Sequence, residues 1–177
     1  MSETDNGRVW PALQKDDAEL KRELFTLLTF RVSGNPYSSD GSFAKSLEYL
    51  PPGLRAMAAT HWLDISLTLD SITRHFGNFG EPGLVAATEA GLIELGLDEL
   101  ATCFREAKEL VMPLMSLRTE ADDDFYEFLE RKGALERAEE LDKRDWGLDS
   151  PNSRNKSLIY GSWIRYARLH PENVFDA

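Results

Sequence analysis

Three histidines and one cysteine are the residues of this chain whose types could support catalysis or metal binding. His61 and Asp64 stand three positions apart on a predicted helix, and His75 follows on the same helix. A divalent metal site in a helical protein takes such pairs from facing helices, usually within a Glu-x-x-His motif, which this chain lacks. A structural hydrogen bond is therefore the favoured role of His61. A helical metalloenzyme that uses His61, Asp64 and His75 is the alternative from a different class.

Cys103 has surroundings that oppose a role as a nucleophile. It adjoins Phe104 on an apolar helix face, where a free cysteine behaves as a small hydrophobic residue. Nearby acidic residues such as Glu106 favour the thiol over the reactive thiolate. The glycine-rich run at 77–83, G-N-F-G-E-P-G, lacks the lysine of a phosphate-binding loop. The sequence therefore predicts no catalytic residue, no cofactor and no metal, and a protein that is not an enzyme.

Acidic residues are the remaining candidates, and they concentrate in the middle of the chain. Residues 81–149 contain 19 Asp and Glu against 8 Lys and Arg, which accounts for the whole net charge of −11. One group surrounds a predicted turn at Gly96. A second follows Thr119, where steps of 3, 4 and 3 residues from Glu120 bring four acids to one helix face. The candidate partner-binding residues are Glu89, Glu94, Asp98, Glu99, Glu120, Asp122, Asp123, Asp124, Glu127 and Glu130.

These acids also have an ordinary explanation as a solvated surface. The helix dipole favours carboxylates in a first turn after Thr119, and Glu127 with Arg131 has the i, i+4 spacing of a common surface ion pair. About 32 residues of helix span roughly 48 Å, so the net −6 of residues 116–149 is about one charge per 8 Å. DNA carries about one charge per 1.7 Å of axis. A DNA-like surface would therefore need several acidic helices together.

The charge balance limits the classes of partner. A strongly acidic protein repels nucleic acid and anionic membranes and attracts basic surfaces. Four basic residues in the last segment, including Arg165 and Arg168, are too few to reverse this repulsion, so we expect no direct nucleic-acid binding. No apolar run approaches the roughly 18 residues of a membrane span, and the first 30 residues lack a signal-peptide pattern. With a single cysteine, a cytoplasmic protein is expected.

Apolar residues at helical spacing predict the elements, and no segment shows the alternation of a strand. Residues 16–177 should form one all-α domain, a multi-helix bundle, behind a flexible N-terminal arm at 1–15. The clearest apolar pattern predicts one continuous helix over 58–76 and consists of Ala58, Trp62, Ile65, Leu69, Ile72 and Phe76. Further helices are predicted from Asp16, over 42–50, over 82–95, from Asp98 to Pro113, from Thr119 and over 160–167.

The helices over 58–76, 84–95 and 100–111 each have an apolar stripe, and they are expected to pack together as the core. Trp62 and Phe104 should therefore be largely buried. The acids after Thr119 should be exposed along one face, namely Glu120, Asp123 and Glu127.

Two segments of the chain resemble the DNA-mimic-protein family. They are T-L-D-S-I-T-R-H-F-G-N at 68–78 and A-T-E-A-G-L-I-E-L-G-L-D-E-L-A-T-C-F-R-E-A at 87–107, and the closing W-I-R-Y-A-R-L-H-P-E-N-V-F at 163–175 is also similar. The likeness covers about residues 54–175, but Leu69-Asp70-Ser71-Ile72 stands where the family has Asn-Gly-Gly-Phe. The resemblance implies an all-α fold, no cofactor and an acidic surface that occupies DNA-binding sites on proteins.

The leading hypothesis is a non-enzymatic acidic binding protein of the DNA-mimic type. Its partner would be a basic DNA-binding protein such as a repressor or a nucleoid protein. The alternative is an immunity or antitoxin-like protein that blocks the basic active site of a toxin. A homodimer stays open, because a seam between two copies and an internal core look alike in one sequence.

Overall fold

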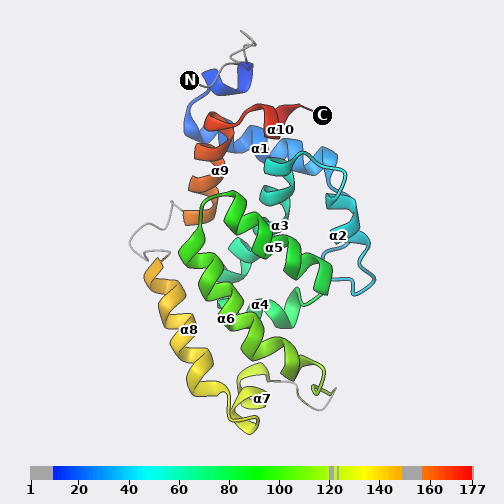
Figure 1. The fold of residues 1–177 in the computed structure, drawn as a ribbon, viewed down its shortest axis with the longest axis vertical. Helices are drawn as coiled ribbons and strands as arrows, with labels where there is room; N and C mark the ends of the chain where they lie inside the picture. The colour runs from blue at the N-terminus through cyan, green and yellow to red at the C-terminus, as the bar shows by residue number, and fades with distance from the viewer. Residues whose placement is uncertain (1–9, 120–121, 123, 149–156, 177) are drawn as a thin grey trace.

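The computed structural model describes residues 10–119, 122, 124–148 and 157–176, which form helices and turns with no strand (Figure 1). The prediction of an all-α helical bundle is confirmed. The elements in chain order are η1 (Pro11–Gln14), α1 (Asp17–Arg31), α2 (Ser42–Leu47), α3 (Pro52–Leu69), α4 (Ile72–Asn78), α5 (Pro82–Glu94), α6 (Asp98–Met115), α7 (Phe125–Arg131), α8 (Leu135–Leu148), α9 (Leu158–Leu169) and α10 (Glu172–Phe175).

Helix α3 lies at the centre of the fold and contacts α2, α4, α5, α9 and α10. Its buried residues run from Gly53 to Ser66 around most of the helix, as expected for a helix surrounded by others. Helix α5 crosses it closely at Gly91, where an added Cβ atom would stand 3.0 Å from the carbonyl oxygen of Ala56. The contact between α3 and α5 therefore requires a residue without a side chain at this point.

Helix α6 connects this centre to the other end of the molecule. It packs against α4, α5 and α8, and it runs from the turn after α5 toward the end where α7 lies (Figure 1). Phe104 is fully buried, as predicted, and packs against Phe76 of α4 at 5.0 Å between ring centroids. Gly96 has φ +70°, so the turn between α5 and α6 uses the left-handed conformation that glycine adopts without cost. The predicted stop of the helix before Gly96 is thus observed.

The predicted continuous helix over 58–76 is wrong. Helix α3 ends at Leu69, whose side chain is 79% exposed, and α4 begins at Ile72 after an extended Ser71. The Ser71 hydroxyl accepts the backbone N–H of Arg74, and the carboxylate of Asp142 accepts both the N–H and the hydroxyl of Thr73. These acceptors satisfy the first N–H groups of a new helix, which makes the break stable.

Two further local expectations are corrected. The bond between the N–H of Thr119 and Asp122 is present at 2.8 Å, but the helix begins only at Phe125, after Asp124, whose carboxylate caps it. Trp62 is only partly buried, and its ring contacts that of the loop residue Tyr37, with 5.9 Å between centroids. The buried face of α3 therefore does not coincide with the predicted apolar stripe, which contains Trp62.

The first and last described elements, η1 and α10, lie at the same end of the molecule (Figure 1). Residues 1–9 of the predicted flexible arm lie outside the described residues. The following segment is held by Arg168 of α9, whose guanidinium donates to the carbonyl oxygens of Leu13 and Lys15, both at 3.1 Å. The first helix thus starts from a fixed position against α9.

Candidate functional site

Glu89, a predicted binding residue, is committed to an internal ion pair. It lies on α5, its side chain is 17% exposed, and it accepts hydrogen bonds from Arg105 at 2.6 Å and from Lys108 of α6. The hydrogen bond from Lys108 is the main reason that the pKa of Glu89 is lowered, and Arg105 adds to it. Glu89 therefore joins α5 to α6, and its charge is balanced within the protein.

The other three acids around the Gly96 turn are exposed. Glu94, at the end of α5, accepts a hydrogen bond from the Tyr166 hydroxyl, and burial followed by this bond raises the pKa of Tyr166 to about 12. Asp98 and Glu99 lie in the first turn of α6, where the helix dipole stabilises them. Within the described part of the chain, Glu94, Asp98 and Glu99 form no ion pair. This turn therefore presents three carboxylates that could meet a partner.

The acids before α7 mainly hold the local backbone. Asp122 accepts from the N–H of Thr119 and from Arg131, and these two interactions, in that order, lower its pKa. Asp124 accepts the N–H of Glu127 at 2.9 Å, which likewise lowers the pKa of Asp124. Both carboxylates therefore stabilise the backbone of this turn. Asp124 is nevertheless exposed, whereas the side chain of Asp122 is only 16% exposed.

The acids on α7 itself are more available. The side chain of Glu127 is 73% exposed and lies 3.9 Å from Arg131, which is a loose ion pair. Glu130 is exposed, and no ion pair to it is present among the residues described here. The two remaining members of the predicted face, Glu120 and Asp123, lie outside the described residues. The expected single acidic face over 120–130 is therefore represented only by Glu127 and Glu130.

Sequence spacing missed two ion pairs of this region because their partners lie on another helix. Glu106 of α6 accepts from Arg137 and from Arg144 of α8, each at 2.7 Å. It also missed two exposed acids, Glu109 on α6 and Glu136 at the start of α8, for which no ion pair exists among the described residues. An exposed acid outside a cluster has no sequence signal of its own.

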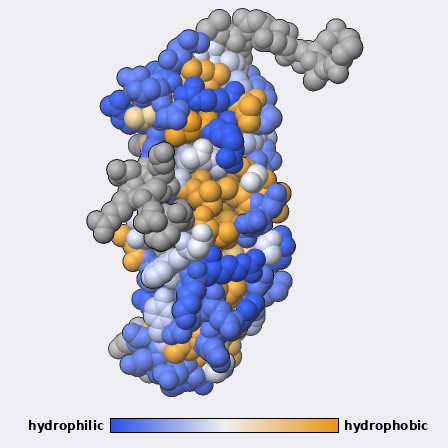
Figure 2. All heavy atoms as spheres, turned by 90° about the vertical axis from the view of Figure 1, so that its left-hand side faces the viewer, coloured by the Kyte–Doolittle hydropathy of each residue, from blue (hydrophilic) through white to orange (hydrophobic). Residues whose placement is uncertain are grey.

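Six of the exposed acids thus form two groups at the two ends of α6. Glu94, Asp98 and Glu99 surround its beginning, and Glu127, Glu130 and Glu136 lie on α7 and the start of α8 near its other end (Figure 1). The side of the molecule that carries α8 is hydrophilic above and below, with an apolar area at mid-height (Figure 2). We call Glu94, Asp98 and Glu99 the turn group, and we call Glu127, Glu130 and Glu136 the α7–α8 group.

The structure separates the residues of the metalloenzyme alternative. His61 Nδ1 lies 2.9 Å from the Tyr160 hydroxyl, whereas His75 Nδ1 lies 2.9 Å from the Ser66 hydroxyl. In the part of the chain that is described, no three His, Cys, Asp or Glu side chains are placed to hold a metal ion. Cys103 is buried, and burial raises its pKa to about 11. The thiol is therefore protonated and not nucleophilic at neutral pH.

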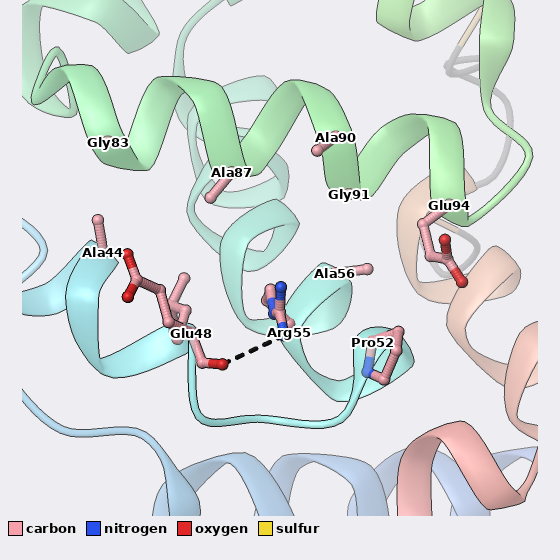
Figure 3. Close-up of a pocket in the computed structure, with 11 residues that line it drawn as sticks. Ala44, Glu48, Pro52, Arg55, Ala56, Gly83, Ala87, Ala90, Gly91 and Glu94 are labelled. Carbon is pink, nitrogen blue, oxygen red and sulfur yellow. Dashed lines mark hydrogen bonds between the residues drawn. The ribbon is translucent and has the colours of Figure 1, made fainter.

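A pocket of about 300 Å³ opens between α2, α3 and α5 (Figure 3). Arg55 is fixed there because its guanidinium donates to the backbone oxygens of Glu48 at 3.2 Å and Leu50 at 3.1 Å. Glu48 and Glu94 lie toward opposite ends of the pocket, and small residues of α5 such as Ala87 form one wall (Figure 3). None of the residues that line the pocket is a serine, threonine, cysteine or histidine.

Fold and surface together define an all-α protein with exposed acidic groups at the two ends of α6. Among the described residues, no helix combines the length and the apolar character needed to cross a membrane. The model of the DMP19-like protein family matches residues 48–166, which is more than half of the chain. The chain therefore belongs to the DMP19-like protein family, and its resemblance to DNA-mimic proteins is confirmed. No curated protein and no solved structure matches the chain.

Proposed function

We propose that this protein is a non-enzymatic acidic binding protein of the DNA-mimic type, which occupies the basic nucleic-acid-binding surface of a DNA-binding protein in the cytoplasm. The observation that carries the proposal is the pair of exposed acidic groups at the two ends of α6. Their carboxylates have no close ion-pair partner within the described residues, apart from the loose contact of Glu127 with Arg131. Membership of the DMP19-like family supports the same function.

The spacing of the two groups suits a nucleic-acid-binding partner. The 18 residues of α6 span about 27 Å, and at about 3.4 Å per base pair this length corresponds to roughly eight base pairs. Two acidic groups at this separation could each meet a basic region that normally contacts phosphates. The function therefore needs two patches of charge and not a continuous row.

The paired acids have a different part in this proposal. Glu89, Glu106 and Asp122 hold neighbouring elements together through Arg and Lys side chains, so they fix the helices that carry the exposed groups. The exposed carboxylates would attract the partner over a distance and discriminate against acidic proteins. Of the predicted site residues, we assign docking to Glu94, Asp98, Glu99, Glu127 and Glu130.

Charge reversal of the turn group tests the proposal. The triple variant Glu94→Lys, Asp98→Lys and Glu99→Lys should reduce the recovery of basic partners from cell lysate by at least about tenfold, since each reversal turns attraction into repulsion. Recovery is measured by affinity purification and quantitative mass spectrometry. A matched control reverses three exposed acids away from α6, Glu19, Glu48 and Glu172, which gives the same change in net charge.

The control separates a local surface from general acidity. Equal losses in both triple variants would mean that net charge alone retains the partners, and undiminished recovery by the turn-group variant would refute the proposal. Recovery of one dedicated toxin as the partner would instead support the immunity-like alternative. Light scattering of the same preparations tests whether the protein is a monomer or a homodimer.

A further inference from the structure

A groove of about 550 Å³ lies between α5 and α6, which run side by side (Figure 1). Seven of its ten lining residues are apolar, namely Pro82, Val85, Ala86, Ala90, Ile93, Met112 and Pro113. Val85 is buried, whereas the other four apolar residues from α5 are exposed, and Ile93 is 50% exposed. The groove is therefore an apolar surface that solvent reaches.

Helix α5 lacks the charged outer face of an ordinary surface helix. Its only charged side chains are Glu89, which is paired with α6, and Glu94 at its end. The exposed positions before Glu94 are Pro82, Gly83, Ala86, Ala90 and Ile93. A helix that is apolar on all sides is normally covered on all sides, and an exposed apolar surface with a polar rim marks an interaction site. The outer face of α5 thus indicates that another molecule covers it.

Acidic residues border the groove and define the charge of its occupant. The turn group lies at the end of the groove that Ile93 lines, since it begins at the next residue. Glu109 lines the groove, is exposed and forms no ion pair within the described part of the chain. The two basic residues of α5 and α6, Arg105 and Lys108, are both bonded to Glu89. The charges left available around the groove are therefore mainly negative, which complements a basic molecule.

The same charges disfavour a second copy of this chain as the occupant. A two-fold interface brings one surface patch against the identical patch of the other copy. Glu109 and the turn group of both copies would then be brought together, and like charges across an interface are costly. A basic protein gains attraction from the acids that a second copy would have to overcome.

The length of the groove suits one helix. From Pro82 to Ile93 it follows α5 for about 16 Å, or roughly three helical turns. Helices that bind in apolar grooves place side chains at positions i, i+4 and i+7 into the groove. A helix with three such apolar residues and with Lys or Arg on its flanks would match both the groove and its acidic border.

We propose that the groove between α5 and α6 binds an amphipathic basic helix of the partner protein. The apolar side chains of that helix lie between α5 and α6, and its Lys and Arg side chains meet the turn group and Glu109. The role of the groove rests on the proposed function, because the occupant is the same basic partner. It adds an apolar contact, which salt does not screen as it screens the charges.

Two synthetic helical peptides of equal composition test the groove. Both contain leucine, lysine and alanine and are about four turns long, so they have the same charge. In the aligned peptide, three leucines stand at i, i+4 and i+7 on one side, and in the scattered peptide they are spread around the helix. By fluorescence anisotropy, the wild-type protein should bind the aligned peptide at least about tenfold more tightly, since only this peptide buries its leucines in the groove.

A polar groove should remove this preference. The double variant Ala86→Gln and Ile93→Gln should bind the two peptides with equal affinity, and both positions are exposed, so the fold is retained. The matched control is Leu69→Gln with Leu169→Gln, which changes two exposed apolar residues outside the groove and should keep the tenfold preference. In the wild type, the Ile93 methyl signals in NMR spectra should shift on addition of the aligned peptide.

The ratio of the two affinities tests the groove, whereas their absolute values test the acids. Charge reversal of the turn group should weaken both peptides and preserve the ratio, so failure of the groove and failure of the acidic docking are distinguishable. Equal binding of both peptides to the wild type, no binding at millimolar concentration, or an unchanged preference in the double glutamine variant would overturn the proposal. A dimer in light scattering that the same variant dissociates would also overturn it, because a second copy would then occupy the groove.

Discussion

His75 is a buried neutral histidine, and this makes the stability of the protein sensitive to mild acid. It is fully buried beside the rings of Phe76, Phe79 and Phe104, and burial lowers its pKa from 6.5 to about 3. In the unfolded chain the pKa returns to about 6.5. Between pH 6.5 and 3 the unfolded state therefore binds one more proton than the folded state, and stability falls as the pH falls.

The variant His75→Asn should remove this dependence. In urea titrations between pH 7 and 5, the free energy of unfolding should fall less steeply in the variant, by up to about 1.4 kcal/mol per pH unit, although the variant is less stable at pH 7. Carboxylates, including Asp142, whose pKa is raised by burial, are the same in both proteins, so the difference in slope reports His75. His170→Asn, at an exposed position, serves as the comparison, and an unchanged slope in His75→Asn would contradict the assignment.

At the scale of elements, the close crossing of α3 and α5 predicts that a side chain at Gly91 destabilises the protein. A Cβ atom at Gly91 would stand 3.0 Å and 3.1 Å from backbone atoms of Ala56, which cannot move away. Gly91→Ala should therefore lower the free energy of unfolding by about 1–3 kcal/mol despite the higher helix propensity of alanine. Thermal and urea unfolding measure this loss.

Gly161 of α9 is the matched control for this crossing. It is also inside a helix, but it is exposed and a Cβ atom there would meet nothing within 4 Å. Gly161→Ala should stabilise the protein by about 0.5–1 kcal/mol through helix propensity alone. If both substitutions stabilised the protein, the close packing of α3 on α5 would be disproved.

The junction of α3 and α4 shows how far local sequence patterns predict an element. The apolar spacing continues through Leu69 to Ile72 and Phe76, and it correctly places Ile72 and Phe76 in the core. The break at Ser71 depends on Asp142, which lies 69 positions after Thr73 and caps α4 from α8. A periodicity of near neighbours contains no information about such a distant acceptor, so helix ends set by tertiary contacts escape it.

At the scale of the whole molecule, the candidate site could likewise be predicted only in part from the sequence. Clusters of acids in the sequence predicted Asp98, Glu99 and Glu130, which are exposed. The same clusters included Glu89, whose partners Arg105 and Lys108 come from the next helix. Local i, i+4 spacing identifies ion pairs within one helix only. Which acids keep their charge available therefore depends on how helices pack, and this becomes visible only in three dimensions.

Docking through exposed carboxylates predicts a strong dependence on salt. The screening length falls from about 10 Å at 0.1 M salt to about 3 Å at 1 M, so partner affinity should decrease by at least about tenfold over this range. The variant that reverses Glu94, Asp98 and Glu99 should show a flatter dependence, because fewer attractive charges remain to be screened. Surface plasmon resonance with a recovered partner measures both slopes, and a salt-independent affinity would exclude electrostatic docking.

The packing of α1 on α9 has a consequence for the order of events during synthesis. Phe25 of α1 contacts Trp163 of α9 at 5.5 Å between rings, and Arg168 fixes the segment that leads into α1. The ribosome adds about 5–20 residues per second, so α1 emerges on the order of ten seconds before α9 exists. During that interval the apolar face of α1 lacks its cover from α9, so we expect the nascent chain to expose apolar surface that chaperones bind until α9 is synthesised.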